Sequence, residues 1–338
     1  MSALSQEKAI VALKKLGSWF RNPSEVLEHG IENAKHYNAW FTPENVKKSV
    51  NALAMMLTDA DIDYWSADIS FAKTPKKIGV ILAGNIPLVG FHDVLCILAT
   101  GNIAAIKLSS ADDKLMELVL YQLVYFEPAF STHIQYVERL KDFEAVIATG
   151  SNNSSRYFDH YFGKVPHIIR KNRNSVAILT GKEDRKSLQN LSSDIFDYFG
   201  LGCRNVSKIY VPENYNFEHF FKGIEICAGV KDHFKYNNNY DYHKSIFLIN
   251  GDKHLDNGFL LLKGDKNLSS PLAVLYYEEY KDLPTLEQKL TGDKALMQCI
   301  VSEKQINIET SPFGHSQKPK LWDYADHVNT IDFLNGLN

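Results

Sequence analysis

The sequence predicts an α/β protein that contains a parallel sheet. Residues 78–83 and 103–108 are short, continuous apolar runs, as expected of strands that are covered on both faces. Residues 87–99, which lie between these runs, have the pattern of a helix that ends near Gly101 and Asn102. A strand, a helix and a second strand within about thirty residues form a βαβ unit, and this unit favours a parallel sheet.

The rest of the chain continues this alternation. Residues 1–70 are predicted to be helical, and Thr42 followed by Pro43 is typical of a helix start. Further helices are expected at 111–126, 155–162, 185–199 and 216–228. Further strands are expected at 133–137, 145–148, 175–179, 208–211, 245–249, 259–263 and 273–277. Residues 237–243 are polar and rich in Tyr, and they are predicted to form a loop.

A chain of 338 residues is long enough to form two domains. The character of the sequence changes near Asn172. We expect one domain to comprise residues 1–172 with 305–338, containing the N-terminal helices. Residues 173–304 are expected to form the second domain.

Composition excludes several classes of protein. The formal net charge is −3, so no basic excess indicates a nucleic-acid partner. No stretch reaches the roughly 18 apolar residues that a spanning helix needs, and charges interrupt the N-terminal region where a signal peptide would be apolar. The 4 cysteines have no paired spacing, so neither a disulfide framework nor a metal site is indicated. We therefore expect a cytoplasmic protein without a membrane span.

Two residues suggest acyl chemistry when they are taken together. Cys203 follows Gly202 just ahead of an apolar strand, and a thiol on such a loop can act as a nucleophile. Asn85 lies at the end of a predicted strand, where its amide can donate to an oxyanion. Each residue also has a plain structural explanation, since free cysteines often fill cores and Asn85 lies in a turn-like Gly-Asn-Ile-Pro sequence. The pair in this order is more specific than either residue alone.

A small-residue turn offers a further candidate site. Gly150 and Ser151 follow a predicted strand and precede a predicted helix. This arrangement can present backbone N–H groups to a phosphate. The usual Gly-x-Gly-x-x-Gly fingerprint of dinucleotide binding is missing, so the turn by itself is a weak signal.

These segments resemble the aldehyde dehydrogenase superfamily, and within it the LuxC-like acyl-CoA reductases. The resemblance covers about residues 76–334 and rests on short segments that match in order. They are Gly84-Asn85-Ile86-Pro87, Ile106-Lys107-Leu108-Ser109-Ser110, Ala148-Thr149-Gly150-Ser151, Gly200-Leu201-Gly202-Cys203, Ser270-Pro271-Leu272-Ala273-Val274, Pro312-Phe313-Gly314 and Leu321-Trp322-Asp323-Tyr324-Ala325-Asp326. The last segment is the one most specific to the subfamily.

The resemblance implies an aldehyde-dehydrogenase-like fold, with a Rossmann-type parallel cofactor domain and an α/β catalytic domain. It implies that Cys203 is the nucleophile and that Asn85 supplies the oxyanion-hole amide. It also implies a nicotinamide cofactor, with Lys107 at the adenosine ribose. The remaining residues that we assign to the cofactor are Ser109, Ser110, Gly150, Ser151 and Pro271.

Two departures from the superfamily pattern bear on function. Aldehyde dehydrogenases carry a Glu that activates water for thioester hydrolysis, whereas the matching residues 168–174 contain no carboxylate. Reduction of a CoA thioester does not need that base. The chain is also short for the superfamily, which puts the superfamily's oligomerisation contacts in doubt, although a homo-oligomer is still expected.

The sequence therefore predicts NADPH-dependent reduction of an acyl-CoA, with a fatty acyl group favoured, to the aldehyde through an S-acyl cysteine. NADPH is favoured because Ser110 stands where the superfamily often has a Glu that repels a 2′-phosphate. Asp112 and Asp113 follow closely and could oppose this preference. The alternatives are an acyltransferase or thioesterase, a non-catalytic assembly subunit, and a glutamyl-phosphate-type reductase. The resemblance also implies an acyl-activating enzyme as partner.

Overall fold

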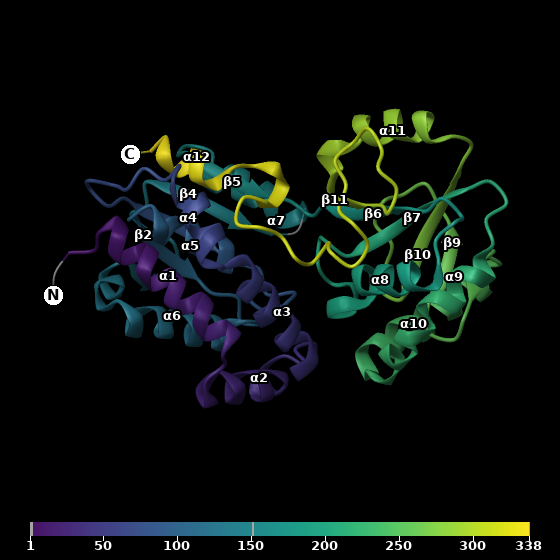
Figure 1. Cartoon of the computed structure of the whole chain (residues 1–338), viewed down its shortest axis with the longest axis horizontal. Coiled ribbons are helices and arrows are strands. Elements are labelled where there is room, and N and C mark those ends of the chain that lie inside the picture. The colour runs from purple at the N-terminus through teal and green to yellow at the C-terminus, as the bar shows by residue number, and fades with distance from the viewer. Residues whose placement is uncertain (1–2, 151, 338) are drawn as a thin grey trace. The chain divides into compact units, whose positions relative to one another are not determined.

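The computed structural model describes residues 3–150 and 152–337, with side chains omitted for 152–156. The chain forms two compact units, one of Met1–Asn172 with Lys318–Asn338 and one of Arg173–Gln317 (Figure 1). We call them unit 1 and unit 2. The return to unit 1 thus falls at Lys318, whereas the sequence boundary was placed at 305. Residues between these positions pair within unit 2, where Ser311 bridges Val301 and Gly314 N–H donates to Asp194.

Unit 1 is built on a five-stranded sheet in the order β3-β2-β1-β4-β5. Its strands are β1 (Lys77–Ile81), β2 (Ile103–Lys107), β3 (Ile134–Tyr136), β4 (Ala145–Thr149) and β5 (His167–Arg170). Every neighbouring pair is parallel. The βαβ unit predicted from the apolar runs is therefore confirmed. Residues 78–80 of β1 and 104–106 of β2 are buried in succession, so both faces of these strands are covered, as the apolar runs predicted.

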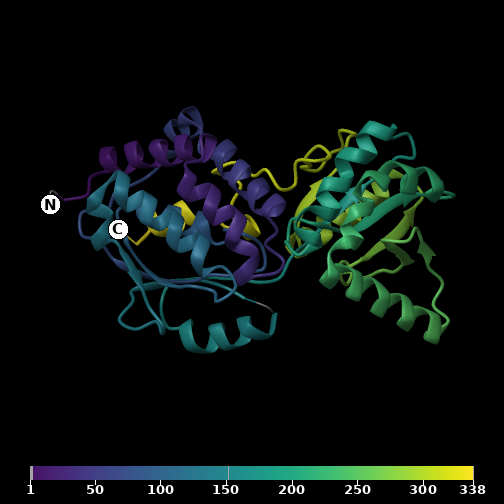
Figure 2. The same cartoon turned by 90° about the horizontal axis from the view of Figure 1, so that it is seen from below.

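Helices cover both faces of this sheet. They are α1 (Gln6–Arg21), α2 (Glu25–Tyr37), α3 (Pro43–Met56), α4 (Asp59–Ser66), α5 (Phe91–Ala99), α6 (Asp113–Phe126), α7 (Asn152–Phe162) and α12 (Thr330–Asn335). Thr42 caps α3 as predicted, because its hydroxyl accepts from Asn45 N–H at 3.3 Å. Figure 2 shows α7 on the opposite side of the sheet from α1 and α6. Right-handed crossovers in opposite directions from β1 and β4 require this division.

The C-terminal residues of unit 1 are bound to it by polar contacts. Arg170, at the end of β5, donates to the Ala325 carbonyl and to the Thr330 hydroxyl. The same guanidinium forms a buried pair with Asp93 of α5, with Nη2 2.7 Å from Oδ1. Trp65 donates to the Tyr324 hydroxyl at 2.9 Å. The segment that carries the Leu321–Asp326 motif is thus part of the fold of unit 1.

Unit 2 contains a six-stranded sheet in the order β11-β6-β7-β10-β9-β8. Its strands are β6 (Asn174–Ile178), β7 (Val206–Pro212), β8 (Leu255–Asp256), β9 (Leu261–Gly264), β10 (Val274–Tyr280) and β11 (Met297–Val301). The pairing is parallel except between β8 and β9. The helices are α8 (Arg185–Phe196), α9 (Phe217–Ile224), α10 (Phe234–Asn250) and α11 (Leu283–Gly292). Figure 1 shows α11 on one side of this sheet and α8 and α9 on the other.

One part of the secondary-structure prediction is wrong. The expected loop at 237–243 and strand at 245–249 both lie within the helix α10. Tyr236, Tyr240 and Phe247 are buried at helical spacing, and Tyr236 Oη donates to the Phe259 carbonyl at 2.9 Å. Tertiary packing has overridden the weak helix propensity of Asn, Asp and Tyr. In the part of the chain that the structure describes, no helix combines the length and apolar character needed to cross a bilayer.

Candidate functional site

The carboxyl edge of the unit 1 sheet is the natural place for a ligand in this unit. The chain runs outward from β1 to β2 and β3 and then returns to β4 and β5 on the other side. Ligands of open parallel sheets bind outside the carboxyl ends of the strands at such a reversal. Asn85 lies in the loop that follows β1, and Gly150 directly follows β4. Both predicted residues therefore lie at the reversal.

The predicted residues after β2 lie at the same edge. Lys107 is the last residue of β2 and is exposed, Ser109 is half-buried, and Ser110 is exposed. A Cβ atom on Gly84 would lie 2.4 Å from Ser109 Oγ, so only glycine fits where the loops after β1 and β2 touch. Leu82 N–H also donates to the Lys107 carbonyl at 3.1 Å. These contacts bring the loop of Asn85 together with Lys107 and both serines.

The small-residue turn after β4 is only partly described. Gly150 N–H donates to the Arg170 carbonyl at 3.3 Å, so this amide is engaged within the protein. Ser151 lies outside the described residues. The assignment of Gly150 and Ser151 to a cofactor phosphate stays a prediction.

Asp112 and Asp113, the two aspartates that could have opposed NADPH, each contact another residue of the protein. Asp112 is buried, and its Oδ2 accepts from Leu88 N–H at 2.6 Å. Burial raises the pKa of the Asp112 carboxyl to about 8, and the charge of Asp113 adds to this shift. Asp113 forms an ion pair with Lys114 at 3.4 Å. Asp112 is thus turned into the protein, and its raised pKa favours the neutral form at neutral pH.

In unit 2, Cys203 lies in a turn just ahead of β7 and is exposed. Its carbonyl accepts from the Ser175 hydroxyl at 2.9 Å. The turn is fastened by Asn205, which is 3% exposed. Asn205 Oδ1 accepts from Gly202 N–H at 2.8 Å, while its Nδ2 donates to the carbonyls of Asp194 at 3.1 Å and Asp197 at 2.8 Å. The thiol is therefore carried on a well-anchored backbone.

The backbone that leads to this turn has an unusual conformation. Tyr198, Phe199 and Gly200 have consecutive positive φ angles of 53°, 59° and 79°. Non-glycine residues adopt this region infrequently, and such residues are often found near functional sites. A Cβ on Gly200 would lie 3.9 Å from Leu272 Cδ2. The segment with Pro271, which is half-buried, therefore lies beside the Cys203 segment in unit 2.

The remaining cysteines are less suited to nucleophilic chemistry. Cys96 is fully buried, and burial raises the pKa of its thiol. Cys227 is half-buried and donates to the Ser192 hydroxyl at 3.2 Å. Cys299 is also half-buried, with its sulfur 3.7 Å from Ser311 Oγ. Of the 4 cysteines, Cys203 alone is exposed.

The sequence prediction missed the residues that support these sites. Asn205 and Ser175 hold the Cys203 turn, and Asp112 holds the loop of Asn85. The position of Asn205, shortly after the cysteine in the same polar segment, was the available signal, because Asn commonly bonds nearby backbone in turns. Ser175 and Asp112 act on partners that are distant in sequence, so no local pattern revealed them.

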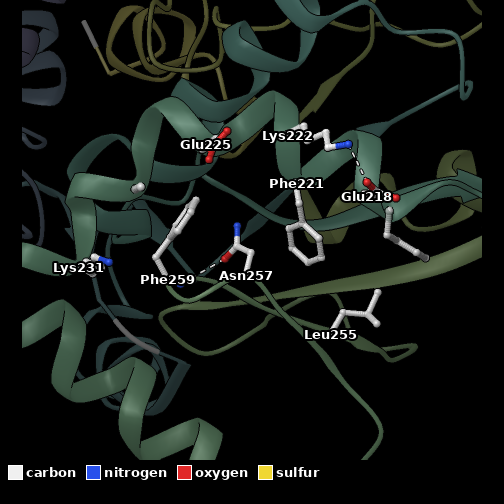
Figure 3. A pocket seen from close by; sticks show the side chains of 10 residues that line it. Glu218, Phe221, Lys222, Glu225, Lys231, Leu255, Asn257 and Phe259 are labelled. Atoms are coloured by element: carbon white, nitrogen blue, oxygen red, sulfur yellow. Dashed lines mark hydrogen bonds and ion pairs between the residues drawn. The ribbon is translucent and has the colours of Figure 1, made fainter.

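A pocket of about 590 Å³ lies elsewhere in unit 2 and contains none of the predicted site residues. Its walls come from α9, from η3 (Glu225–Asp232) and from residues 255–259 (Figure 3). Phe217, Phe221 and Phe259 give it an apolar lining, and Asn257 holds the adjoining turn through Leu260 N–H at 2.8 Å. Lysines and glutamates both lie at this pocket, so its charge favours no class of ligand. No group of His, Cys, Asp and Glu within residues 3–150 and 152–337 could hold a metal ion.

Comparison with solved structures identifies the fold. The chain is similar to aldehyde dehydrogenase 21 of Physcomitrella patens, solved with the product succinate, with a TM-score of 0.67, 12% identity, and coverage of 98% of this chain and 85% of that one. It is also similar to an NADP-dependent enzyme of E. coli (TM-score 0.65, 11% identity, coverage 90% and 74%). A third similar structure is an aldehyde dehydrogenase from Bacillus cereus, solved with NAD⁺. It has a TM-score of 0.62 and 13% identity, and the match covers 90% of this chain and 73% of that one. No family model and no curated protein matches the sequence. The predicted aldehyde-dehydrogenase-like fold is confirmed.

Proposed function

We propose that this protein reduces an acyl-CoA thioester to the aldehyde with NADPH as reductant. The observation that carries the proposal is the exposed thiol of Cys203, held on an anchored turn in a chain with an aldehyde-dehydrogenase-like fold. An exposed, fixed thiol is suited to attack on a carbonyl carbon. A protein that merely keeps this fold needs no exposed cysteine at this position.

The residues at the carboxyl edge of the unit 1 sheet fit a dinucleotide. Lys107 offers an ammonium group, and Ser109 and Ser110 offer hydroxyls, which suit phosphate and ribose oxygens. Gly84 lets the loop of Asn85 pack against Ser109, where a Cβ atom would lie 2.4 Å from Ser109 Oγ. With Asp112 turned inward, the carboxylate nearest to Ser110 in sequence does not oppose a 2′-phosphate. NADPH would supply a hydride, and the protein would supply position and charge stabilisation.

The proposed reaction proceeds through a covalent intermediate on Cys203. The Sγ thiolate attacks the thioester carbonyl carbon, and the Asn85 amide donates to the resulting oxyanion. The bond from carbon to the CoA sulfur then breaks, and CoA leaves as the thiol. Hydride addition to the acyl carbon, with a proton taken up from solvent at the oxygen, would leave a thiohemiacetal on Cys203. Its collapse releases the aldehyde and restores the thiol.

The segment 168–174 supports reduction over hydrolysis. It spans the end of β5 and the start of β6 and contains no carboxylate. The side chain of Arg170, which is buried, donates hydrogen bonds to Asp93, to the Ala325 carbonyl and to the Thr330 hydroxyl. This segment therefore supplies no base to activate water. We expect the S-acyl enzyme to hydrolyse slowly and to persist until the reductant reacts with it.

A spectrophotometric assay tests the proposal. NADPH oxidation is followed with acyl-CoAs from acetyl to palmitoyl, and the aldehyde product is identified. Cys203→Ala should abolish turnover, and Asn85→Ala should lower it by about 10²–10³-fold. Release of CoA without NADPH oxidation would indicate an acyltransferase or thioesterase instead. No reaction with any acyl-CoA would contradict the proposal.

A further inference from the structure

One buried carboxyl group fastens the loop that carries Asn85. This loop, residues 82–90, joins β1 to α5. Asp112 is 5% exposed, and its Oδ2 accepts from Leu88 N–H at 2.6 Å. Leu88 has a φ of 59°, a left-handed conformation that leucine rarely adopts without support. The bond from Asp112 provides that support close to Asn85.

The other described contacts of the loop involve no acidic side chain besides Asp112. Ser49 donates to the Pro87 carbonyl at 2.7 Å, and Leu82 N–H donates to the Lys107 carbonyl at 3.1 Å. These contacts involve neutral groups that do not respond to pH. Residues 82–90 themselves include no titratable side chain. Among these loop contacts, Asp112 is the group whose charge changes with pH.

The surroundings of Asp112 favour its neutral form. Oδ1 is buried and has no hydrogen-bond partner among the described residues. Burial raises the pKa of this carboxyl to about 8, against the smaller opposing effect of the Leu88 N–H bond, and Asp113 adds to the rise. Asn38, which donates to the Ala111 carbonyl at 3.2 Å, and Ser49 face this region as neutral groups. Lys114 pairs with Asp113 and Glu117.

We propose that Asp112 is a positioning residue for Asn85, whose neutral carboxyl holds loop 82–90 closed and whose ionisation opens it. A charged Oδ1 needs water, and water reaches this buried atom only when Leu88 and its loop move away. The effect on catalysis rests on the proposed function, in which Asn85 donates to the oxyanion. The effect on the loop does not depend on that function.

The catalytic arm of the test compares pH profiles. The wild type and Asp112→Asn are assayed for kcat from pH 6 to 9.5, since Asn keeps an oxygen for Leu88 N–H. The ratio of wild-type to variant kcat should fall by about tenfold between pH 7 and pH 9 as the carboxyl ionises. Asp142→Asn, at an exposed residue outside the loop and its anchors, is the matched control and should leave the wild-type profile unchanged. A ratio that stays constant with pH overturns the catalytic role.

The structural arm uses hydrogen exchange of residues 82–90. The wild type and Asp112→Asn are compared at the same pH, so that the intrinsic exchange rates are equal. The wild type should lose protection relative to the variant between pH 7 and pH 9, and Asp142→Asn should again follow the wild type. Equal protection at every pH overturns the proposal, whether or not the protein reduces acyl-CoA. If the loop opens as expected but no acyl-CoA is reduced at any pH, the proposed function fails while the role of Asp112 in holding the loop is supported.

Discussion

We predict that a single substitution at Ser110 changes the cofactor preference. It is exposed at the carboxyl edge of the unit 1 sheet, close in sequence to Lys107. We expect a higher kcat/KM for NADPH than for NADH. Ser110→Glu should shift the preference toward NADH by about 1–3 kcal/mol, because a carboxylate repels the 2′-phosphate.

Steady-state kinetics with both cofactors provide the measurement. Ser131→Glu is the matched control, since Ser131 is exposed in η1 (Pro128–Thr132), which precedes β3 and so lies toward the opposite edge of the sheet. It should leave the preference unchanged. Equal kcat/KM values for the two cofactors in the wild type, or a preference for NADH, would show that this segment was misinterpreted.

At the scale of residues, the local sequence predicted whether a side chain is exposed better than it predicted where that side chain points. The glycines beside Cys203 indicated an open turn, and the thiol is indeed exposed. The direction of the Asp112 side chain could not be predicted, because it depends on a backbone N–H that lies 24 positions away. When a loop that is distant in sequence buries a carboxyl group, the residues next to that group in the sequence do not indicate the burial.

At the scale of elements, the turn between α8 and β7 depends on Asn205. Its Nδ2 donates to two carbonyls, and its Oδ1 accepts from Gly202 N–H. Asn205→Asp keeps the acceptor but sets a carboxylate oxygen against those carbonyls. We expect the free energy of unfolding to fall by about 1–3 kcal/mol, since buried donors are lost. We also expect acylation of Cys203 to slow.

Urea denaturation and the rate of acyl-enzyme formation measure these effects. Asn216→Asp is the matched control, because Asn216 Oδ1 caps α9 by accepting from Glu218 and His219 N–H, and Asp also serves as an N-cap. The control should retain wild-type stability and acylation. If Asn205→Asp behaves like the control, the anchoring role of Asn205 is wrong.

The elements themselves were predictable to different degrees. Strands β1, β2 and β4 of unit 1 are buried on both faces, so continuous apolar runs revealed them, whereas β5, which is exposed at His167, was not predicted. Helix α10 was missed because its apolar residues face both inward and outward. Tyr236 and Phe247 are buried, whereas Leu248 and Ile249 are 64% and 84% exposed. A helix without a clear apolar stripe cannot be recognised by periodicity.

At the scale of the whole molecule, Arg170 links distant parts of unit 1. It pairs with Asp93 of α5 and donates to Ala325 and Thr330 in the C-terminal segment. Its carbonyl also accepts from Gly150 N–H. Arg170→Met leaves the carboxylate of Asp93 buried without its cation. We expect a loss of about 3–5 kcal/mol in the free energy of unfolding of unit 1.

Denaturation followed by tryptophan fluorescence suits this test, since all 4 tryptophans (Trp19, Trp40, Trp65 and Trp322) lie in unit 1. Lys171→Met is the matched control. The Lys171–Asp159 pair spans 3.9 Å, and its side chains are 57% and 51% exposed. An exposed pair contributes little, so the control should unfold like the wild type. Similar stability of the two variants would mean that the Arg170 contacts do not hold unit 1 together.

The division of the chain illustrates what sequence could and could not give at this scale. The first crossing near Asn172 coincides with a change in sequence character. The return at Lys318 does not, because residues 311–316 are held in unit 2 by contacts that no local pattern reveals. Asp194 of α8 accepts from Gly314 N–H at 2.6 Å and from Ser316 N–H at 3.0 Å.

The most direct test of the central claim is the mass of the protein after incubation with an acyl-CoA in the absence of cofactor. Without a reductant, and with no carboxylate in residues 168–174 to activate water, the acyl group should stay on Cys203 as a thioester. Peptide mapping should place it there, and Cys96→Ala, Cys227→Ala and Cys299→Ala should retain it while Cys203→Ala loses it. An acyl group on another cysteine, or none in the wild type, would contradict the assignment of Cys203 as the nucleophile.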